Sequence, residues 1–328
     1  MAPHALNVGV NVRVIAGEGA VNPRCQNLAR QTGKTMPMTA ARCLGLASAL
    51  LLTAAQAEPL PKDDRERACW LQHTRERTRV KLTEPTTVDF SNLRDGQTVR
   101  SPFQVDFAVR GMGVVSAGKP HPKAGHHHLL INTRLPINVA DQIPFNDGHR
   151  HFGKAQTGAT LELPAGPHKL RLLFADHEHR PYFVYSPEIT VNVVGPRTAE
   201  PVRIDAGCDA WYQEEISRPR PPGPRIQISN LRDAEPVVSP VNVRLAADGL
   251  GVAPRGHGGP ANGHFMLDVQ SAGKSVQLVD LGNGATQTNL FLSPGAYLLR
   301  LRLLDDARAK DLAPPAELNI TVAAQERL

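Results

Sequence analysis

The sequence contains the same segment twice, and this internal repeat restricts the chain to two tandem domains. Residues 88–95 (VDFSNLRD) match residues 226–233 (IQISNLRD) at an offset of 138. The offset is 129 further on, where residues 163–172 (LPAGPHKLRL) match residues 292–301 (LSPGAYLLRL). Because stacked-repeat folds need about three units or more, two copies predict two domains, each with its own core.

Each copy has the pattern of short strands separated by turns that contain glycine and proline. Apolar and polar residues alternate in residues 103–109 (FQVDFAV), 169–174 (KLRLLF) and 188–193 (EITVNV), as in half-buried strands. The turn before Tyr297 resembles the corner at which a tyrosine opens strand F of an immunoglobulin-like domain. The sequence therefore predicts an all-β protein of two tandem immunoglobulin-like β-sandwiches, with helix expected only around residues 63–79.

The repeat also predicts the domain boundaries. We expect the first sandwich at residues 88–195 and the second, more divergent one at residues 226–323. A segment with one cysteine and one tryptophan precedes each: residues 58–87 hold Cys69, and residues 196–225 hold Cys208 and end in a stiff proline-rich linker. In an exported protein, an isolated cysteine pair is most simply a disulfide, which would clamp equivalent points of the repeat. A thiol metal or redox site is the alternative.

The segment ahead of Glu58 has the features of a secretory signal peptide. Residues 38–57 contain Arg42, an apolar run at 44–55 and the small-x-small sequence AQA at 55–57. We expect cleavage after Ala57 and a periplasmic or secreted protein, because the apolar run is too short for a spanning helix. We interpret residues 1–37 as the result of a start codon assigned too far upstream, with the true start at Met36 or Met38. A regulatory N-terminal extension is the alternative.

The charge of the chain argues against a nucleic-acid partner. The net charge is +6, from 37 Lys and Arg against 31 Asp and Glu. Five of those basic residues and one acid lie in residues 1–57, which leaves 32 basic against 30 acidic residues in the rest. Nucleic-acid binding needs a concentrated basic face, and the sequence shows none. The partner is otherwise open, with an envelope protein or a glycan as candidates.

Histidines are concentrated in the first copy. Nine of the thirteen lie between His121 and His179, and six form His-x-His pairs, namely His126/His128, His149/His151 and His177/His179. Alternate side chains of a strand point to the same face, so a pair presents two imidazoles side by side. Three or four imidazoles suffice to bind zinc, copper, nickel or iron. The six residues are therefore candidate metal ligands, with Asp176 and Glu178 as carboxylates that orient the rings.

The second copy helps to assign the remaining histidines. His127 aligns with the apolar Phe265, so we expect it to be buried in the core with a satisfied hydrogen bond. His168 aligns with Tyr297 and is expected to be structural. His126 and His128 should point away from the core. The positions of His151, His177 and His179 are polar in the second copy, where they are Asp280, Asp306 and Arg308.

Three functions remain open for the histidines. The first is a metal site, for which copper or zinc is the expected cofactor. The second is a metal-free, hydrogen-bonded cluster in an envelope-binding or structural module that recognises a protein or glycan. The third, a metal-dependent redox enzyme, has little support, since the chain lacks the G-x-S-x-G, P-loop and H-E-x-x-H motifs.

Several motifs occur in the order typical of one family. Residues 125–131 (GHHHLLI), 151–157 (HFGKAQT), 163–168 (LPAGPH) and 176–179 (DHEH), with the opening SNLRDG, resemble the bacterial domain-of-unknown-function family 4399. The resemblance covers about residues 88–194, with a degenerate second copy at about 226–323 that departs at the motifs equivalent to residues 151–157 and 176–179. It implies an exported bacterial β-sandwich protein and no particular activity.

Overall fold

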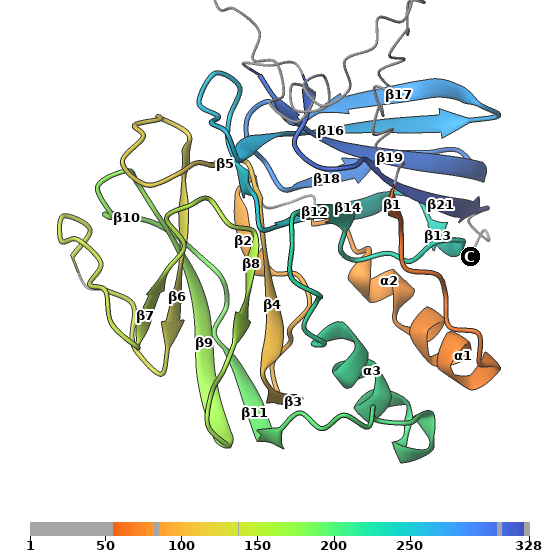
Figure 1. The fold of residues 1–328 in the computed structure, drawn as a ribbon, viewed down its shortest axis with the longest axis horizontal. Helices are drawn as coiled ribbons and strands as arrows, with labels where there is room; N and C mark the ends of the chain where they lie inside the picture. Colours follow the sequence, from red (N-terminus) through yellow and green to blue (C-terminus); the bar gives the residue numbers. More distant parts are fainter. Residues whose placement is uncertain (1–54, 82–84, 137, 307–309, 325–328) are drawn as a thin grey trace, which may run out of the picture. The chain divides into compact units, whose positions relative to one another are not determined.

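The computed structural model describes residues 55–81, 85–136, 138–306 and 310–324. In these ranges the predicted architecture of two tandem β-sandwiches is confirmed (Figure 1). The predicted start and signal peptide lie outside the described residues except for residues 55–57, and so does Arg308. None of the helices in the described ranges is long and apolar enough to cross a membrane.

The first sandwich consists of a three-stranded sheet and a seven-stranded sheet. The small sheet has the order β2–β4–β8, with β2 at Thr87–Phe90, β4 at Phe103–Arg110 and β8 at Gly158–Leu161. The large sheet follows the path β3–β11–β9–β6–β5, and β7 pairs with β6 and β10 with β9. Its strands are β3 (Gln97–Ser101), β5 (Gly113–Val114), β6 (Ala124–Ile131), β7 (His149–His151), β9 (Gly166–Ala175), β10 (Pro181–Tyr185) and β11 (Ile189–Pro196).

The second sandwich repeats the first strand for strand. Its small sheet has the order β12–β14–β18, and its large sheet follows the path β1–β21–β19–β16–β15, with β13, β17 and β20 pairing at its sides. The strands are β12 (Arg225–Ile228), β13 (Glu235–Val238), β14 (Val241–Asp248), β15 (Gly251–Val252), β16 (Asn262–Ser271), β17 (Lys274–Asp280), β18 (Gln287–Leu290), β19 (Gly295–Asp305), β20 (Lys310–Asp311) and β21 (Ala316–Ala323). The extra strand β1 (Ala55–Gln56), from the end of the predicted leader, pairs with β21 in parallel.

The alternation seen in the sequence corresponds to the two faces of these sheets. Phe103, Phe107 and Phe174 are buried in the first core, and Phe265, at the position of His127, is buried in the second. Strand β6 lies between β9 and β7 in the large sheet, with His126 opposite Ala175 and His128 opposite His151. Its eight residues are all buried, so both faces of this central strand are covered.

Helices occur in the two segments that precede the sandwiches, as expected for the first of them. They are α1 (Asp64–Gln72), α2 (Thr74–Arg77) and α3 (Cys208–Ile216), with a short 3₁₀ turn, η2, at Ile204–Ala206. The Asp63 side chain accepts from the backbone N–H groups of Arg65 and Glu66, so α1 begins there with these donors capped. The predicted Cys69–Cys208 disulfide is confirmed and joins α1 to α3.

Each of these helical segments docks on the other copy. The Asn92 side-chain amide of the first copy donates to the carbonyl of Ile216 at 2.8 Å, and the equivalent Asn230 amide donates to the carbonyl of Arg77 at 3.0 Å. The helical segment ahead of the first sandwich therefore contacts the second, and that ahead of the second contacts the first.

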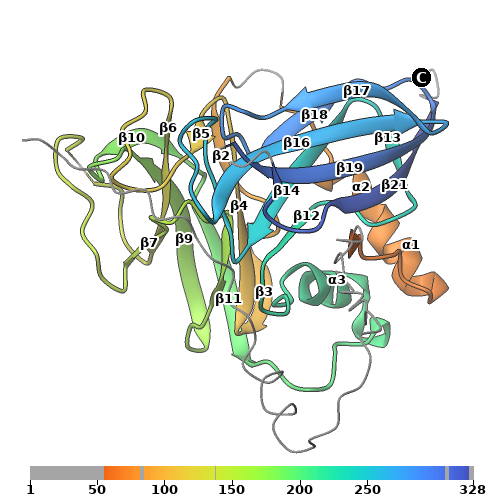
Figure 2. The same cartoon turned by 45° about the horizontal axis from the view of Figure 1, so that its top comes forward.

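The small sheets contact one another in the same reciprocal way (Figure 2). The Val109 N–H donates to Thr286 Oγ1 at 2.9 Å, and the equivalent Ala247 N–H donates to Thr157 Oγ1 at 2.8 Å. When a residue of the first copy contacts a residue of the second, and their equivalents in the opposite copies make the same contact, the interface has two-fold character. The two copies in this single chain thus associate like the subunits of a homodimer.

Candidate metal centre

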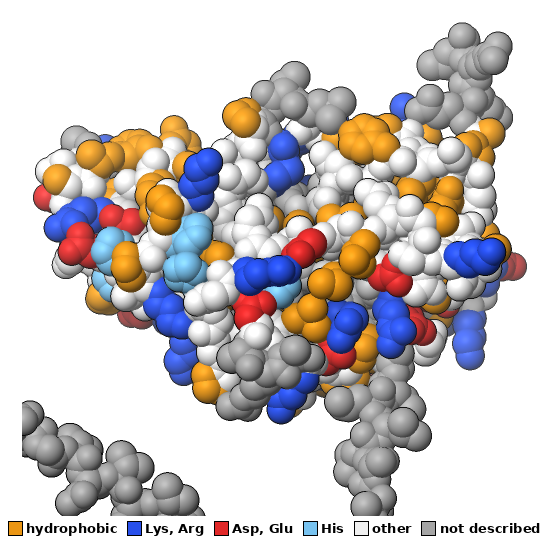
Figure 3. Space-filling view, turned by 90° about the horizontal axis from the view of Figure 1, so that it is seen from above, with side chains coloured by type: hydrophobic (Ala, Val, Ile, Leu, Met, Phe, Trp, Pro, Cys, Tyr) orange, Lys and Arg blue, Asp and Glu red, His pale blue; other side chains and the backbone are white. Residues whose placement is uncertain are grey.

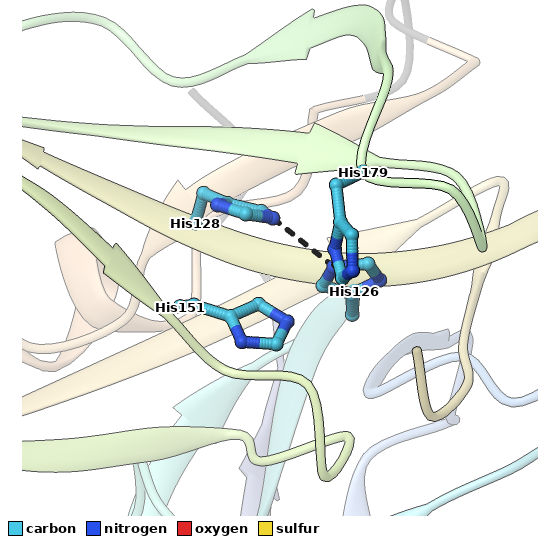
Figure 4. A group of neighbouring side chains, drawn as sticks. All are labelled: His126, His128, His151 and His179. Atoms are coloured by element: carbon cyan, nitrogen blue, oxygen red, sulfur yellow. Dashed lines mark hydrogen bonds between the residues drawn. The ribbon is translucent and has the colours of Figure 1, made fainter. Parts of the chain in front are cut away.

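Four histidines of the first sandwich gather at one place, from three separate segments (Figure 4). Strand β6 supplies His126 and His128, strand β7 supplies His151, and the turn after β9 supplies His179. One ring nitrogen from each lies within 4.8 Å of those of the other three. The group can therefore hold a metal ion.

The ring nitrogens lie near the spacing of a tetrahedral site. His128 Nε2 is 3.0 Å from His126 Nε2, and His126 Nε2 is 3.1 Å from His179 Nδ1. Nitrogens bound tetrahedrally to zinc at about 2.0–2.1 Å would be about 3.3 Å apart. Small rotations of the rings would thus bring four nitrogens into ligating positions.

Burial favours the neutral form of three imidazoles of the group, those of His126, His128 and His151. Burial, followed by the effect of the neighbouring histidines, lowers the pKa of His126 to about 3 and that of His128 to about 2. Burial also lowers the pKa of His151, followed by the effect of His179. Because the neutral imidazole is the form that binds metals, these side chains are in the ligating state at neutral pH.

Local backbone structure places His151 in the group. The β6–β7 register sets His151 directly across from His128. At Gly153, an added Cβ would lie 2.2 Å from His151 Cε1 and 2.4 Å from its Nε2, so the missing side chain leaves room for the ring. Gly153 therefore provides the space that the ring of His151 occupies.

A tight turn places His179. Asp176 Oδ1 accepts from the backbone N–H groups of Glu178 and Arg180, both at 2.8 Å, and His179 has a φ of 66°. Glu178 forms an ion pair with Arg180. In the described structure neither Asp176 nor Glu178 bonds to a ring of the group, so Asp176 acts on His179 through the backbone of the turn rather than by orienting its imidazole.

Phe145 forms the rim of the group. Its ring centroid lies 4.8 Å from that of His151 and 4.9 Å from that of His179, yet the residue is 59% exposed. The Ile143 N–H donates to the carbonyl of His179 at 2.9 Å and ties this loop to the turn. Histidine side chains accordingly reach the surface beside hydrophobic ones (Figure 3). The sequence did not single out Phe145, because nothing in its local pattern marks it.

Two of the six candidate ligands lie outside the group. His149 Nδ1 is 2.9 Å from Asn146 Oδ1, in the turn that leads into β7. His177 precedes the tight turn, where its carbonyl accepts from the Gly118 N–H at 3.0 Å. Neither belongs to the set of converging ring nitrogens. The structure thus brings together both histidines of the first pair and one of each other pair.

His127 is buried in the core, but the expected hydrogen bond is wrong. Neither ring nitrogen has a partner among the described residues, and the ring packs against Phe107 and Phe174. The position is apolar in character, which is why the other copy has phenylalanine there. His168, by contrast, has a partner for each ring nitrogen. Its Nε2 is 2.9 Å from the carbonyl oxygen of Pro164, and its Nδ1 is 3.1 Å from the side-chain nitrogen of Asn132.

The equivalent place in the second sandwich contains a different set of side chains. His264 occupies the position of His126, and its Nδ1 is 2.8 Å from Asp306 Oδ1. Asp280 occupies the position of His151 and forms an ion pair with Arg255, whose Nη2 is 3.3 Å from His264 Nε2. Charged groups of opposite sign therefore satisfy one another there.

Fold and site together define a tandem immunoglobulin-like protein with a four-imidazole group in its first domain only. The chain belongs to the family described as Domain of unknown function (DUF4399), whose model matches residues 105–194 and 243–324. Both copies fall within the family, as the sequence motifs predicted, although the matches begin inside the sandwiches rather than at their first strands. No curated protein matches the chain.

Solved structures similar to this chain contain fibronectin type III domains. Fibronectin(III)-like modules of Clostridium thermocellum CbhA match at 10% identity and a TM-score of 0.20, covering 74% of this chain and all of theirs. A two-domain fibronectin type III segment of chicken tenascin matches at 12% identity and a TM-score of 0.18, covering 73% and 100%. The central fibronectin III array of RIM-binding protein matches at 11% identity and a TM-score of 0.23, covering 76% and 72%.

Proposed function

We propose that the first sandwich binds one transition-metal ion, copper or zinc, through His126, His128, His151 and His179. The observation that carries this proposal is the convergence of four ring nitrogens within 4.8 Å from three segments. Four imidazoles suit copper and zinc, which bind well to nitrogen ligands. The protein is then an exported metal-binding module with a second, metal-free sandwich.

Two further features support a metal rather than a hydrogen-bonded cluster. A closed chain of imidazoles would need donors and acceptors in alternation, yet the Nδ1 atoms of His126 and His128 are buried without partners. Burial of unpaired polar atoms costs about 1–3 kcal/mol each, which ligation through the opposite nitrogens would offset. The rim histidine His151 is exposed, so an ion has a route to the buried pair.

The test is metal binding by the purified full chain. Titration calorimetry with Zn²⁺ and with Cu²⁺, after treatment with a chelator, should give one ion per chain. His151→Ala and His179→Ala should each weaken binding at least about 100-fold, since loss of outer-sphere partners alone costs about 10–100-fold. Both ligands lie at the rim, where truncation leaves the core intact.

Two histidines that lie outside the group supply matched controls. His149→Ala and His177→Ala remove an imidazole from the same two segments and should leave the affinity and the stoichiometry unchanged. If no variant binds differently from the wild-type chain, the metal proposal is wrong, and a metal-free module for a protein or glycan partner takes its place.

We also propose that the protein is exported and cleaved after Ala57. The composition of residues 38–57 supports a signal peptide, and the Cys69–Cys208 disulfide suits an oxidising compartment. Mass spectrometry of the protein recovered from the cell envelope should give an N-terminus at Glu58. An intact residue 1–57 segment in that fraction would contradict the proposal.

A further inference from the structure

A cavity of about 800 Å³ lies among the two helical segments, the linker and strand β12, and none of the four clustered histidines lines it. Its walls include residues of α2, α3 and the proline-rich stretch 218–224, and Figure 1 shows both helices below β12. Ligand sites in proteins have volumes of about 300–1,000 Å³. The cavity is therefore large enough for a small organic molecule.

The lining of this cavity is rich in arginine. It contains eight Lys or Arg and five Asp or Glu side chains. Five of its seven arginines form ion pairs with carboxylates, namely Arg77, Arg94, Arg218, Arg220 and Arg232. The other two, Arg225 and Arg244, form no ion pair with any described residue.

Arg244 is held by neutral acceptors only. Its Nε donates to Asn242 Oδ1 at 3.1 Å, and its Nη1 donates to the carbonyls of Phe90 and Ser91, both at 3.2 Å. No described residue accepts from its Nη2, although the side chain lines the cavity. The guanidinium thus has a fixed orientation and one free edge.

Arg220 in the same cavity shows what a compensated guanidinium looks like. Burial lowers the pKa of Arg220, but the carboxylates of Asp106 and Asp248 outweigh burial and raise it above its usual value. Burial lowers the pKa of Arg244, and the nearby Asp89, which forms an ion pair with Lys81, does not outweigh burial. A partly buried cation without an ion pair is unfavourable, so an anion at this edge would be stabilised.

Arg225 extends the same polar surface. It lies on the same face of β12 as Gln227, because alternate residues of a strand share a face, and both line the cavity, as does Ser229 just after the strand. Ser229 is hydrogen-bonded through its N–H to the carbonyl of Arg244. The Nε of Arg225 is buried without an acceptor. Its Nη2 donates to the carbonyl of Pro222 at 3.3 Å. The β12–β14 ladder therefore carries at each end a guanidinium that has neutral acceptors but no ion pair with any described residue.

We propose that this cavity binds a small ligand that carries an oxyanion group, with Arg244 as its main anchor and Arg225 as a second contact. The planar guanidinium fork matches the geometry of carboxylate and phosphate oxygens, and such charge-assisted bonds are among the strongest in proteins. The ligand is distinct from the metal ion proposed for the histidines and does not depend on it.

Calorimetric titration of the full chain with inorganic phosphate and, separately, with citrate tests this site. Chloride at matched ionic strength is the blank. We expect saturable binding of at least one probe. Binding of phosphate alone indicates phosphate recognition, and binding of citrate alone indicates carboxylate recognition. Arg244→Gln should weaken it at least about tenfold. Arg203→Gln, an exposed arginine outside the cavity, should leave it unchanged.

Two results would overturn the proposal: no saturable binding of either probe up to about 10 mM, or equal binding by the wild-type chain and Arg244→Gln. If Arg244→Gln shows no cooperative unfolding transition, Arg244→Lys decides, because lysine keeps the charge but loses the fork. Binding weakened about tenfold in Arg244→Lys supports the site, and unchanged binding rejects it.

Discussion

The histidine end of the first sandwich and the matching end of the second have the same backbone but opposite chemistry. In the first, His128 lies across from His151, and in the second the same register sets Met266 across from Asp280. The first brings four imidazoles together, with the Nδ1 atoms of His126 and His128 buried without a partner among the described residues, whereas the second sets His264 beside two carboxylates and an arginine. The difference shows that the same place in the fold can hold either converging imidazoles or internal ion pairs, depending on a few side chains.

The largest expected effect concerns the Cys69–Cys208 disulfide, which joins the helical segments that precede the two sandwiches. The double change Cys69→Ser with Cys208→Ser should lower the free energy of unfolding by about 4–5 kcal/mol, because the bridge closes a loop of 139 residues. Urea denaturation with and without the change measures it, and the metal stoichiometry should not alter. A loss below about 1 kcal/mol would mean that the reciprocal contacts alone hold the copies together.

A second prediction converts the first site into the second. His128→Met with His151→Asp gives the first copy the residues of the second, and should weaken Zn²⁺ or Cu²⁺ binding at least about 100-fold, or about 2.7 kcal/mol. Calorimetry measures the affinity. His264→Ala in the second copy is the control and should change nothing. If His264→Ala lowers the stoichiometry, the second sandwich also binds metal and the contrast fails.

A smaller effect is expected from the glycine that makes room for His151. Gly153→Ala should displace that ring and weaken metal binding about tenfold, with the free energy of unfolding changed by less than about 1 kcal/mol, since a side chain rather than backbone must move. Gly259→Ala, where an added Cβ meets nothing within 4 Å, is the matched control for both measurements. Unchanged affinity in Gly153→Ala would show that the ring of His151 is not a ligand.

The smallest effect tests the core position at which the copies differ. His127→Phe introduces the residue of the second copy and should raise the free energy of unfolding at pH 7 by about 1 kcal/mol, because it removes unpaired buried nitrogens. Chemical denaturation of the metal-free chain measures the change.

The same variant has an expected pH dependence. Burial lowers the pKa of His127 to about 3, against 6.5 when unfolded, so below pH 6.5 the unfolded chain takes up a proton that the folded chain does not. Stability of the wild-type chain therefore falls as the pH drops from 6.5 towards 3, and the advantage of His127→Phe at pH 5 should grow by about 2 kcal/mol. An advantage that stays constant with pH would contradict this account.

The fold was largely predictable because its signals are local or repeated. Alternation of period two in residues 103–109 marks β4 directly, and the second copy confirms which residues of β6 face the core. The disulfide followed from two cysteines at equivalent points. Each of these inferences needs only neighbours in sequence or the comparison of one copy with the other.

The site was predictable only where its residues lie in regular strands. His126 and His128 share a face because β6 is a strand, but His179 lies in a turn with positive φ, where alternation has no meaning. His149 turns to Asn146 instead. The cover over the outer face of β6, which includes Phe145, comes from a loop that only tertiary packing brings there, and the sequence carries no signal for it.

The reciprocal hydrogen bonds between the two copies have a consequence for how the molecule assembles. Partners that are separate chains meet only at a sufficient protein concentration, whereas here the linker keeps each partner at a high effective concentration. The midpoint of thermal unfolding should accordingly be independent of dilution. Tethering also means that a mutation enters only one half of the pair, so either half can change its chemistry while its neighbour continues to provide the complementary surface.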